Sequence, residues 1–85
     1  MSFDSLGRLP VGGSGVVRRV NGTRPLARRL MEMGLLPGTR VTLTRVAPLG
    51  DPLELRLRGY ALSIRRNEAL QIEIEPEPVT RSSAR

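Results

Sequence analysis

The sequence predicts a mainly β fold, a small closed barrel of about five strands with one short helix. The chain has 85 residues, enough to bury one thin hydrophobic core. Several short segments alternate apolar and polar side chains, the period of half-buried strands, and one segment has the spacing of an amphipathic helix. Short strands in so short a chain favour a sheet that curls and closes on itself.

The expected strands, in chain order, are Gly15–Val20, Val41–Val46, Leu53–Arg58, Leu62–Ile64 and Leu70–Glu75. The first is rich in β-branched residues and follows a glycine-rich turn. The third and fourth predict a hairpin whose turn is Gly59-Tyr60. In the last strand, strict alternation predicts that one face carries Leu70, Ile72 and Ile74.

The expected helix runs from Pro25 to Met33. Its apolar side chains recur at i, i+4 and i+7, at Leu26, Leu30 and Met33. Thr23 is the expected N-cap, because its hydroxyl can accept a hydrogen bond from the first turn. Gly34 is expected to end the helix in the left-handed conformation.

The inward-facing positions of these elements give an expected core of Val16, Val20, Leu26, Leu30, Val41, Leu43, Leu55, Leu57, Leu62, Ile64, Ile72 and Ile74. Residues 1–75 are therefore expected to form one domain. Residues 76–85 are expected to be a disordered C-terminal tail, because Pro76 and Pro78 lack backbone donors and few apolar side chains follow them.

The composition argues against enzymatic and metal chemistry. The chain has no cysteine and no histidine, so it lacks the two best ligands for Zn²⁺ or Fe²⁺ and the commonest general base. The close carboxylate sets are Asp51 with Glu54, and Glu73 with Glu75 and Glu77, which fit a solvated surface. We expect no catalytic residues, no metal site and no cofactor.

Net charge is +6, and all fourteen basic residues are arginine. This charge fits a nucleic-acid or lipid surface, a docking face for an acidic protein, or an arginine-biased composition spread over a solvated surface. Only Phe3 and Tyr60 are aromatic, which disfavours nucleic-acid binding because base-binding surfaces commonly use aromatic platforms.

No apolar run is long enough to cross a membrane and no signal peptide is evident, so a cytoplasmic location is expected.

A set of short segments is specific in its order and spacing: Leu9–Gly12 with Gly15–Val17, Arg28–Gly38, Ala47–Pro52, Gly59-Tyr60 with Leu62, and Arg65 with Glu68-Ala69. The set resembles the ferrous-iron transport protein A (FeoA) family from about Leu6 to Ile74. The resemblance implies an SH3-like barrel and a cytosolic, non-enzymatic accessory role. The implied partner is FeoB, a membrane ferrous-iron transporter whose cytoplasmic part carries a GTP-hydrolysing domain.

Four residues that packing does not explain are the candidate partner-binding site: Arg28, Arg29, Leu49 and Asp51. Leu49 would be an apolar loop tip, and the arginines could pair with carboxylates on a partner.

The expected protein is a monomer or weak dimer that meets the membrane only through its partner. The alternatives are a basic SH3-like nucleic-acid-binding module and an isolated metal-dependent regulator domain, since the fold also recurs in diphtheria-toxin-repressor-type proteins. The latter is disfavoured because no helix-turn-helix precedes the barrel.

Overall fold

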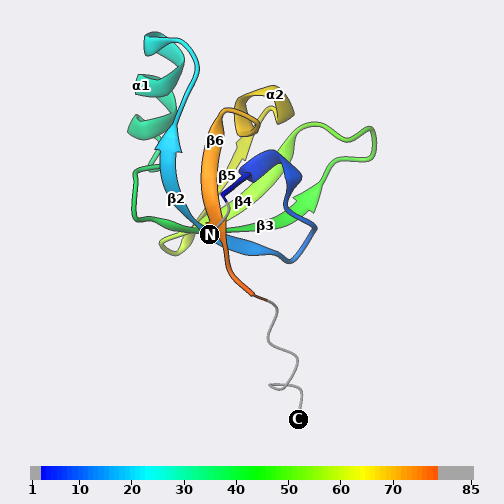
Figure 1. Cartoon of the computed structure of the whole chain (residues 1–85). Coiled ribbons are helices and arrows are strands. Elements are labelled where there is room, and N and C mark those ends of the chain that lie inside the picture. The colour runs from blue at the N-terminus through cyan, green and yellow to red at the C-terminus, as the bar shows by residue number, and fades with distance from the viewer. Residues whose placement is uncertain (1–2, 79–85) are drawn as a thin grey trace.

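Six antiparallel strands, in the order β1-β6-β2-β3-β4-β5, make up the sheet of the computed structural model, which describes residues 3–78 (Figure 1). Along the chain the elements are β1 (Asp4–Ser5), the 3₁₀ helix η1 (Leu6–Arg8), β2 (Ser14–Val20), α1 (Arg24–Glu32), β3 (Arg40–Val46), β4 (Leu53–Leu57), β5 (Tyr60–Ile64), α2 (Arg66–Ala69) and β6 (Ile72–Pro76). The expected mainly β fold is confirmed. The additional strand β1 has two residues, too few for an alternation pattern to reveal.

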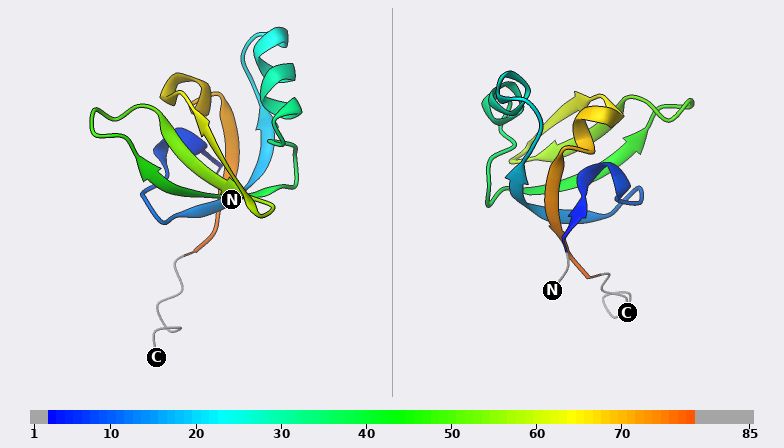
Figure 2. Two further views of the ribbon diagram at one scale, coloured as in Figure 1. Left: turned by 180° about the vertical axis from the view of Figure 1, so that it is seen from behind. Right: turned by 45° about the horizontal axis from the view of Figure 1, so that its top comes forward.

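Two bulges bend the sheet around its core. The register shifts between Val17 and Arg19 where β2 pairs with β6, and between Leu43 and Arg45 where β3 pairs with β4. A bulge adds one residue to one strand and increases the local twist, which is how a short sheet curls. The helix α1 stands beside β2, at the side of this curled sheet (Figure 2).

The bulge in β2 also corrects the expected core. The alternation predicted Val16 and Val20 inside, but Val17 is fully buried and Val16 is only half-buried. Because the extra residue resets the alternation, Val17 and Val20 both pack against the core despite their odd spacing.

The remaining expected core positions pack in or against the core, which also includes residues that the sequence did not single out. Leu26 and Leu62 are partly buried, and the fully buried set gains Leu6, Leu35 and Ala69. Leu53 is also fully buried, as the alternation along Leu53–Arg58 predicts. Leu6 lies in η1 and Leu35 lies between α1 and β3, outside any periodic segment. Their burial therefore leaves no periodic signal in the sequence.

The hairpin between β4 and β5 is confirmed, but its turn lies one residue earlier than expected. Arg58 and Gly59 form the turn with φ values of 51° and 85°, and Tyr60 already pairs with Leu57. Two successive positive φ values are the geometry of the tight turns that match strand twist.

The last strand was predicted to begin at Leu70, but β6 begins two residues later, at Ile72. Residues Arg66–Ala69 form α2, β6 starts at Ile72, and Leu70 is 44% exposed rather than inward. A carboxylate oxygen of Glu68 accepts a hydrogen bond from the Arg65 backbone N–H at 3.0 Å, which stabilises this short helix. A four-residue helix is too short to show a helical period in the sequence.

The α1 helix agrees closely with its prediction. The Thr23 hydroxyl accepts a hydrogen bond from the Leu26 N–H at 3.3 Å, and Leu30 is fully buried. Gly34 follows the helix with φ of 109°, as expected. The Tyr60 hydroxyl donates to the Met33 carbonyl oxygen at 2.5 Å, which ties the end of α1 to β5.

The strand β6 extends one residue past position 75, where the domain was expected to end. Pro76 is the last residue of β6, and the Glu77 N–H donates to the Ser14 carbonyl at 2.9 Å. The Glu77 carboxylate accepts two hydrogen bonds from Arg40, which raise the pKa of that guanidinium together with the charge of Glu77. Residues 79–85 of the predicted tail lie outside the described residues.

Candidate functional site

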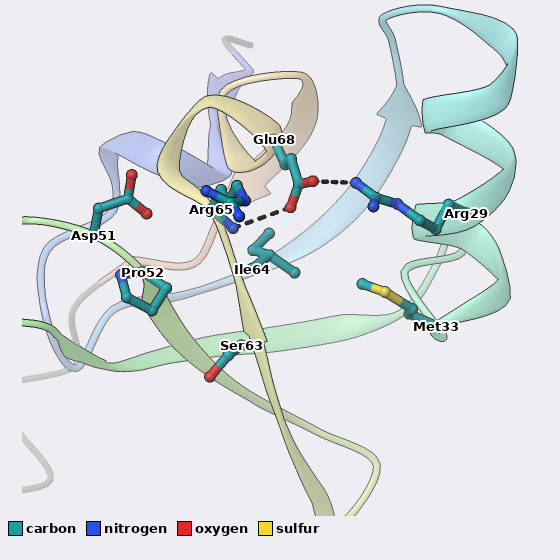
Figure 3. A pocket seen from close by; sticks show the side chains of 8 residues that line it. All are labelled: Arg29, Met33, Asp51, Pro52, Ser63, Ile64, Arg65 and Glu68. Atoms are coloured by element: carbon teal, nitrogen blue, oxygen red, sulfur yellow. Dashed lines mark hydrogen bonds and ion pairs between the residues drawn. The ribbon is translucent and has the colours of Figure 1, made fainter.

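An open cleft of about 520 Å³ separates α1 from α2 and the end of β5 (Figure 3). Its walls come from four parts of the chain: Arg29, Met33, Asp51, Pro52, Ser63, Ile64, Arg65 and Glu68. Polar and apolar side chains are mixed in it. The cleft therefore offers both charge and an apolar surface to a ligand.

An ion pair between Arg29 and Glu68 crosses the cleft and joins α1 to α2. The Glu68 side chain is 14% exposed, while that of Arg29 is 57% exposed. From the sequence, Arg29 was expected to pair with a carboxylate on a partner. In the structure its charge is already balanced within the chain.

The loop between β3 and β4 is held by Arg66 of α2. The Arg66 N–H donates to the Asp51 carboxylate at 3.0 Å, and its guanidinium donates to the Gly50 carbonyl at 2.9 Å. The same guanidinium donates to the Gly7 carbonyl at 2.9 Å, which connects the loop to η1. Asp51 therefore lines the cleft and also fixes the loop, so part of its role is structural.

Leu49 stands at the tip of that loop and is 96% exposed. This agrees with the expected apolar tip. Its neighbours in the loop are anchored through Asp51 and Gly50, so the side chain is presented from a fixed backbone.

Arg28 does not share the cleft with the other candidates. It lines a second open groove along α1, together with Arg24, Ala27, Met31, Glu32 and Leu36. The structure thus brings Arg29 and Asp51 to one cleft with Leu49 on the adjoining loop, and places Arg28 on another face of the helix. Met33 and Glu68 were not predicted as cleft residues, because the cleft depends on how two helices far apart in the sequence approach each other.

The carboxylate sets singled out in the sequence are engaged by neighbouring donors. Glu54 pairs with Arg45 at 3.1 Å, Glu75 pairs with Arg18, and Glu73 accepts a hydrogen bond from the Asn21 amide at 3.1 Å. Among residues 3–78, no three acidic side chains converge as metal ligands.

We expect anaerobic calorimetry with Fe²⁺ to show no stoichiometric site with a sub-micromolar dissociation constant. Separated carboxylates bind hard cations weakly unless several oxygens converge. A parallel titration with Mg²⁺ measures non-specific carboxylate binding. Stoichiometric, tight Fe²⁺ binding that disappears in an Asp51→Ala, Glu54→Ala variant would contradict this expectation.

No helix within residues 3–78 has both the length and the apolar character required to span a bilayer.

The family model and a curated relative indicate the same family. The FeoA domain family model matches residues 5–76. The Fe(2+) transport protein A/Fe(2+) transporter FeoB fusion protein of Porphyromonas gingivalis (strain ATCC BAA-308 / W83) is 39% identical over 70 residues. That match covers 82% of this chain but only 8% of the fusion protein.

Solved structures share the fold. The FeoA-like protein from Clostridium acetobutylicum is similar with a TM-score of 0.86 and 32% identity, over 94% of this chain and 93% of that one. FeoA of Stenotrophomonas maltophilia, a procaryotic SH3 domain protein complexed with zinc, gives a TM-score of 0.70 and 28% identity, over 86% and 94% of the two chains. The SH3-like architecture is thereby confirmed. With its family match and these relatives, the chain belongs to the FeoA family, which is associated with ferrous iron transport.

Proposed function

We propose that this protein is a non-enzymatic, cytoplasmic accessory protein of ferrous-iron uptake. It docks, as a monomer or weak dimer, onto the cytoplasmic GTPase part of a FeoB-type transporter. It associates with the membrane only through this transporter. In this role it supports or regulates transport.

The observation that carries the proposal is the fusion in Porphyromonas gingivalis, where a segment 39% identical to this chain is part of one polypeptide with FeoB. Fusion fixes two domains at a high effective concentration, which favours pairs that act together. FeoA of Stenotrophomonas maltophilia is described as a candidate ferrous iron transport activating factor, which agrees with the same role.

The docking surface we propose is the α1–α2 cleft together with the Leu49 loop tip. Leu49 is almost fully exposed, although burial of a leucine side chain stabilises a protein by about 1.5–3 kcal/mol. The cleft beside it contributes Met33 and the partly exposed Arg29–Glu68 pair. An apolar centre with a charged rim is the usual composition of a protein interface.

We expect Leu49→Ser to weaken binding to the purified cytoplasmic domain of the transporter about tenfold, since this loss of apolar burial is worth at least about 1.4 kcal/mol. The fold should be unaffected, because the side chain is 96% exposed. Val11→Ser is the matched control, since Val11 is an apolar residue 62% exposed in another loop. Calorimetry or surface plasmon resonance measures the affinities, and circular dichroism measures the fold.

Equal losses in Leu49→Ser and Val11→Ser would indicate a general solubility effect and contradict a site at the loop tip. Unchanged affinity in Leu49→Ser would place the interface elsewhere. No binding of the wild-type chain to the transporter domain, with or without guanine nucleotide, would overturn the docking proposal itself.

A further inference from the structure

The two edges of the sheet differ in how they are protected. At one edge, β1 has two residues and offers little backbone for pairing. At the other edge, β5 has five residues and, among residues 3–78, pairs only with β4. Exposed edge strands recruit further strands unless a protein protects them with prolines, charges, bulges or very short length.

None of these protections occurs in β5. Its sequence, Tyr60–Ile64, has neither a proline nor a charged residue. Its register with β4 is continuous, whereas the pairings of β2 with β6 and of β3 with β4 both contain bulges. This edge is therefore regular and uncharged along its whole length.

The register shows which backbone groups of β5 point outward. Leu57 and Tyr60 close a two-residue turn, so they form a hydrogen-bonded pair, and pairs of this kind alternate along an antiparallel ladder. Ala61 and Ser63 fall on the intervening positions, opposite Arg56 and Glu54. Their N–H and C=O groups thus point away from β4, and both residues are exposed.

The cleft adjoins this edge. Ser63 and Ile64 line it, and in Figure 3 they lie between Pro52 and Met33, the residue that follows α1. The Tyr60 hydroxyl reaches the Met33 carbonyl near one end of β5, and the Arg29–Glu68 pair lies near the other. A short extended segment beside β5 would therefore have backbone partners on the strand and an apolar contact with the partly buried Met33.

We propose that β5 binds a short, extended, acidic segment of a protein partner as an added strand. Main-chain hydrogen bonds to Ala61 and Ser63 would give the affinity, as in other strand-addition complexes. Arg58 and Arg65 flank β5, and neither guanidinium forms an ion pair within residues 3–78. Carboxylates at the two ends of the added segment would complement both arginines.

The same arginines argue against a second copy of the chain. Antiparallel pairing of two β5 strands about Leu62 would bring Arg58 of one copy to the Arg65 end of the other. Like charges placed opposite each other destabilise a strand pair. An acidic segment is therefore the better occupant.

Ser63→Pro tests the proposal, because it removes an outward N–H without removing a bond to β4. Ser63→Ala is the matched control, since it removes the hydroxyl and keeps the N–H. The inference rests on the proposed function for the identity of the partner, so the first probe is the transporter's cytoplasmic domain. We expect Ser63→Pro to bind it at least tenfold more weakly than wild type, and Ser63→Ala to bind it normally. Equal binding by all three forms would overturn strand addition and leave the docking proposal intact.

A second probe keeps the test independent of the transporter and of the folding of the proline variant. It is a synthetic seven-residue strand peptide with glutamate at each end, compared with copies that carry lysine ends or N-methylated amides. We expect the acidic peptide to shift the Ala61 and Ser63 amide signals in NMR spectra of the wild-type chain. We expect about tenfold weaker binding of both modified peptides, and weaker binding of the acidic peptide to Arg65→Gln.

Binding unaffected by N-methylation, or no binding of any peptide, would overturn the inference even if the transporter domain binds. Concentration-dependent dimerisation that Ser63→Pro abolishes would also overturn it, because the occupant would then be a second copy. Failure of the transporter domain alone, with the expected peptide results, would refute the proposed partner and support the strand-addition site.

Discussion

Gly34→Ala is expected to lower the free energy of unfolding by about 2–4 kcal/mol. Gly34 has φ of 109°, where an alanine is strained. A methyl group there would also overlap the Tyr60 hydroxyl, which is held in place by its hydrogen bond to the Met33 carbonyl. Urea denaturation followed by circular dichroism gives the change in stability.

Two companion variants separate the strain from the overlap. Gly38→Ala is the control, because Gly38 has φ of 94° but open space around its Cα, so it should cost only about 1 kcal/mol. In a Tyr60→Phe background the overlap is relieved, and the cost of Gly34→Ala should fall towards that of the control. Equal costs in the two backgrounds would show that the Tyr60 hydroxyl does not constrain Gly34.

Leu55→Ala is expected to lower the free energy of unfolding by about 2–5 kcal/mol, as large-to-small changes in cores do. Leu55 is fully buried at the centre of β4, opposite Leu43 on β3 and Leu62 on β5. Ile72→Ala in β6 should cost a similar amount, because Ile72 is also fully buried. Chemical denaturation at 25 °C measures both.

Arg56→Ala is the matched control for Leu55→Ala. Arg56 is the next residue of the same strand and is exposed, so its truncation should change stability by no more than about 0.5 kcal/mol. If Leu55→Ala does not fold, Ile64→Val provides a milder core change of about 0.5–1.5 kcal/mol. A control variant less stable than the core variants would contradict the assignment of inner and outer faces.

Periodicity predicted the elements that are long enough to show it. The alternation of Leu53, Leu55 and Leu57 located β4, and the stripe of Leu26, Leu30 and Met33 located α1. Bulges, one-turn helices and buried loop residues have no period, so the burial of Val17, the helix α2 and the burial of Leu35 appear only in three dimensions.

The sequence predicted a site residue correctly only where its neighbours along the chain determine its environment. Leu49 lies between Pro48 and Gly50, and that loop context was enough to predict its exposure. Arg29 flanks the buried stripe of the helix, so it was expected to pair with a carboxylate on a partner. Glu68 lies 39 residues away, and only the fold brings the two side chains together.

The position of β6 bears on how the chain comes to fold during synthesis. This strand is last in the chain among the described elements but lies between β1 and β2 in the sheet. Until Ile72–Pro76 have left the ribosome, β1 has no strand to pair with and β2 can pair only with β3, and the fully buried Ile72 and Ile74 are missing from the core. Such sequence-distant pairing is slow compared with helix formation. The sheet is therefore completed in a late step after β6 emerges, and the earlier strands have to remain unaggregated until then.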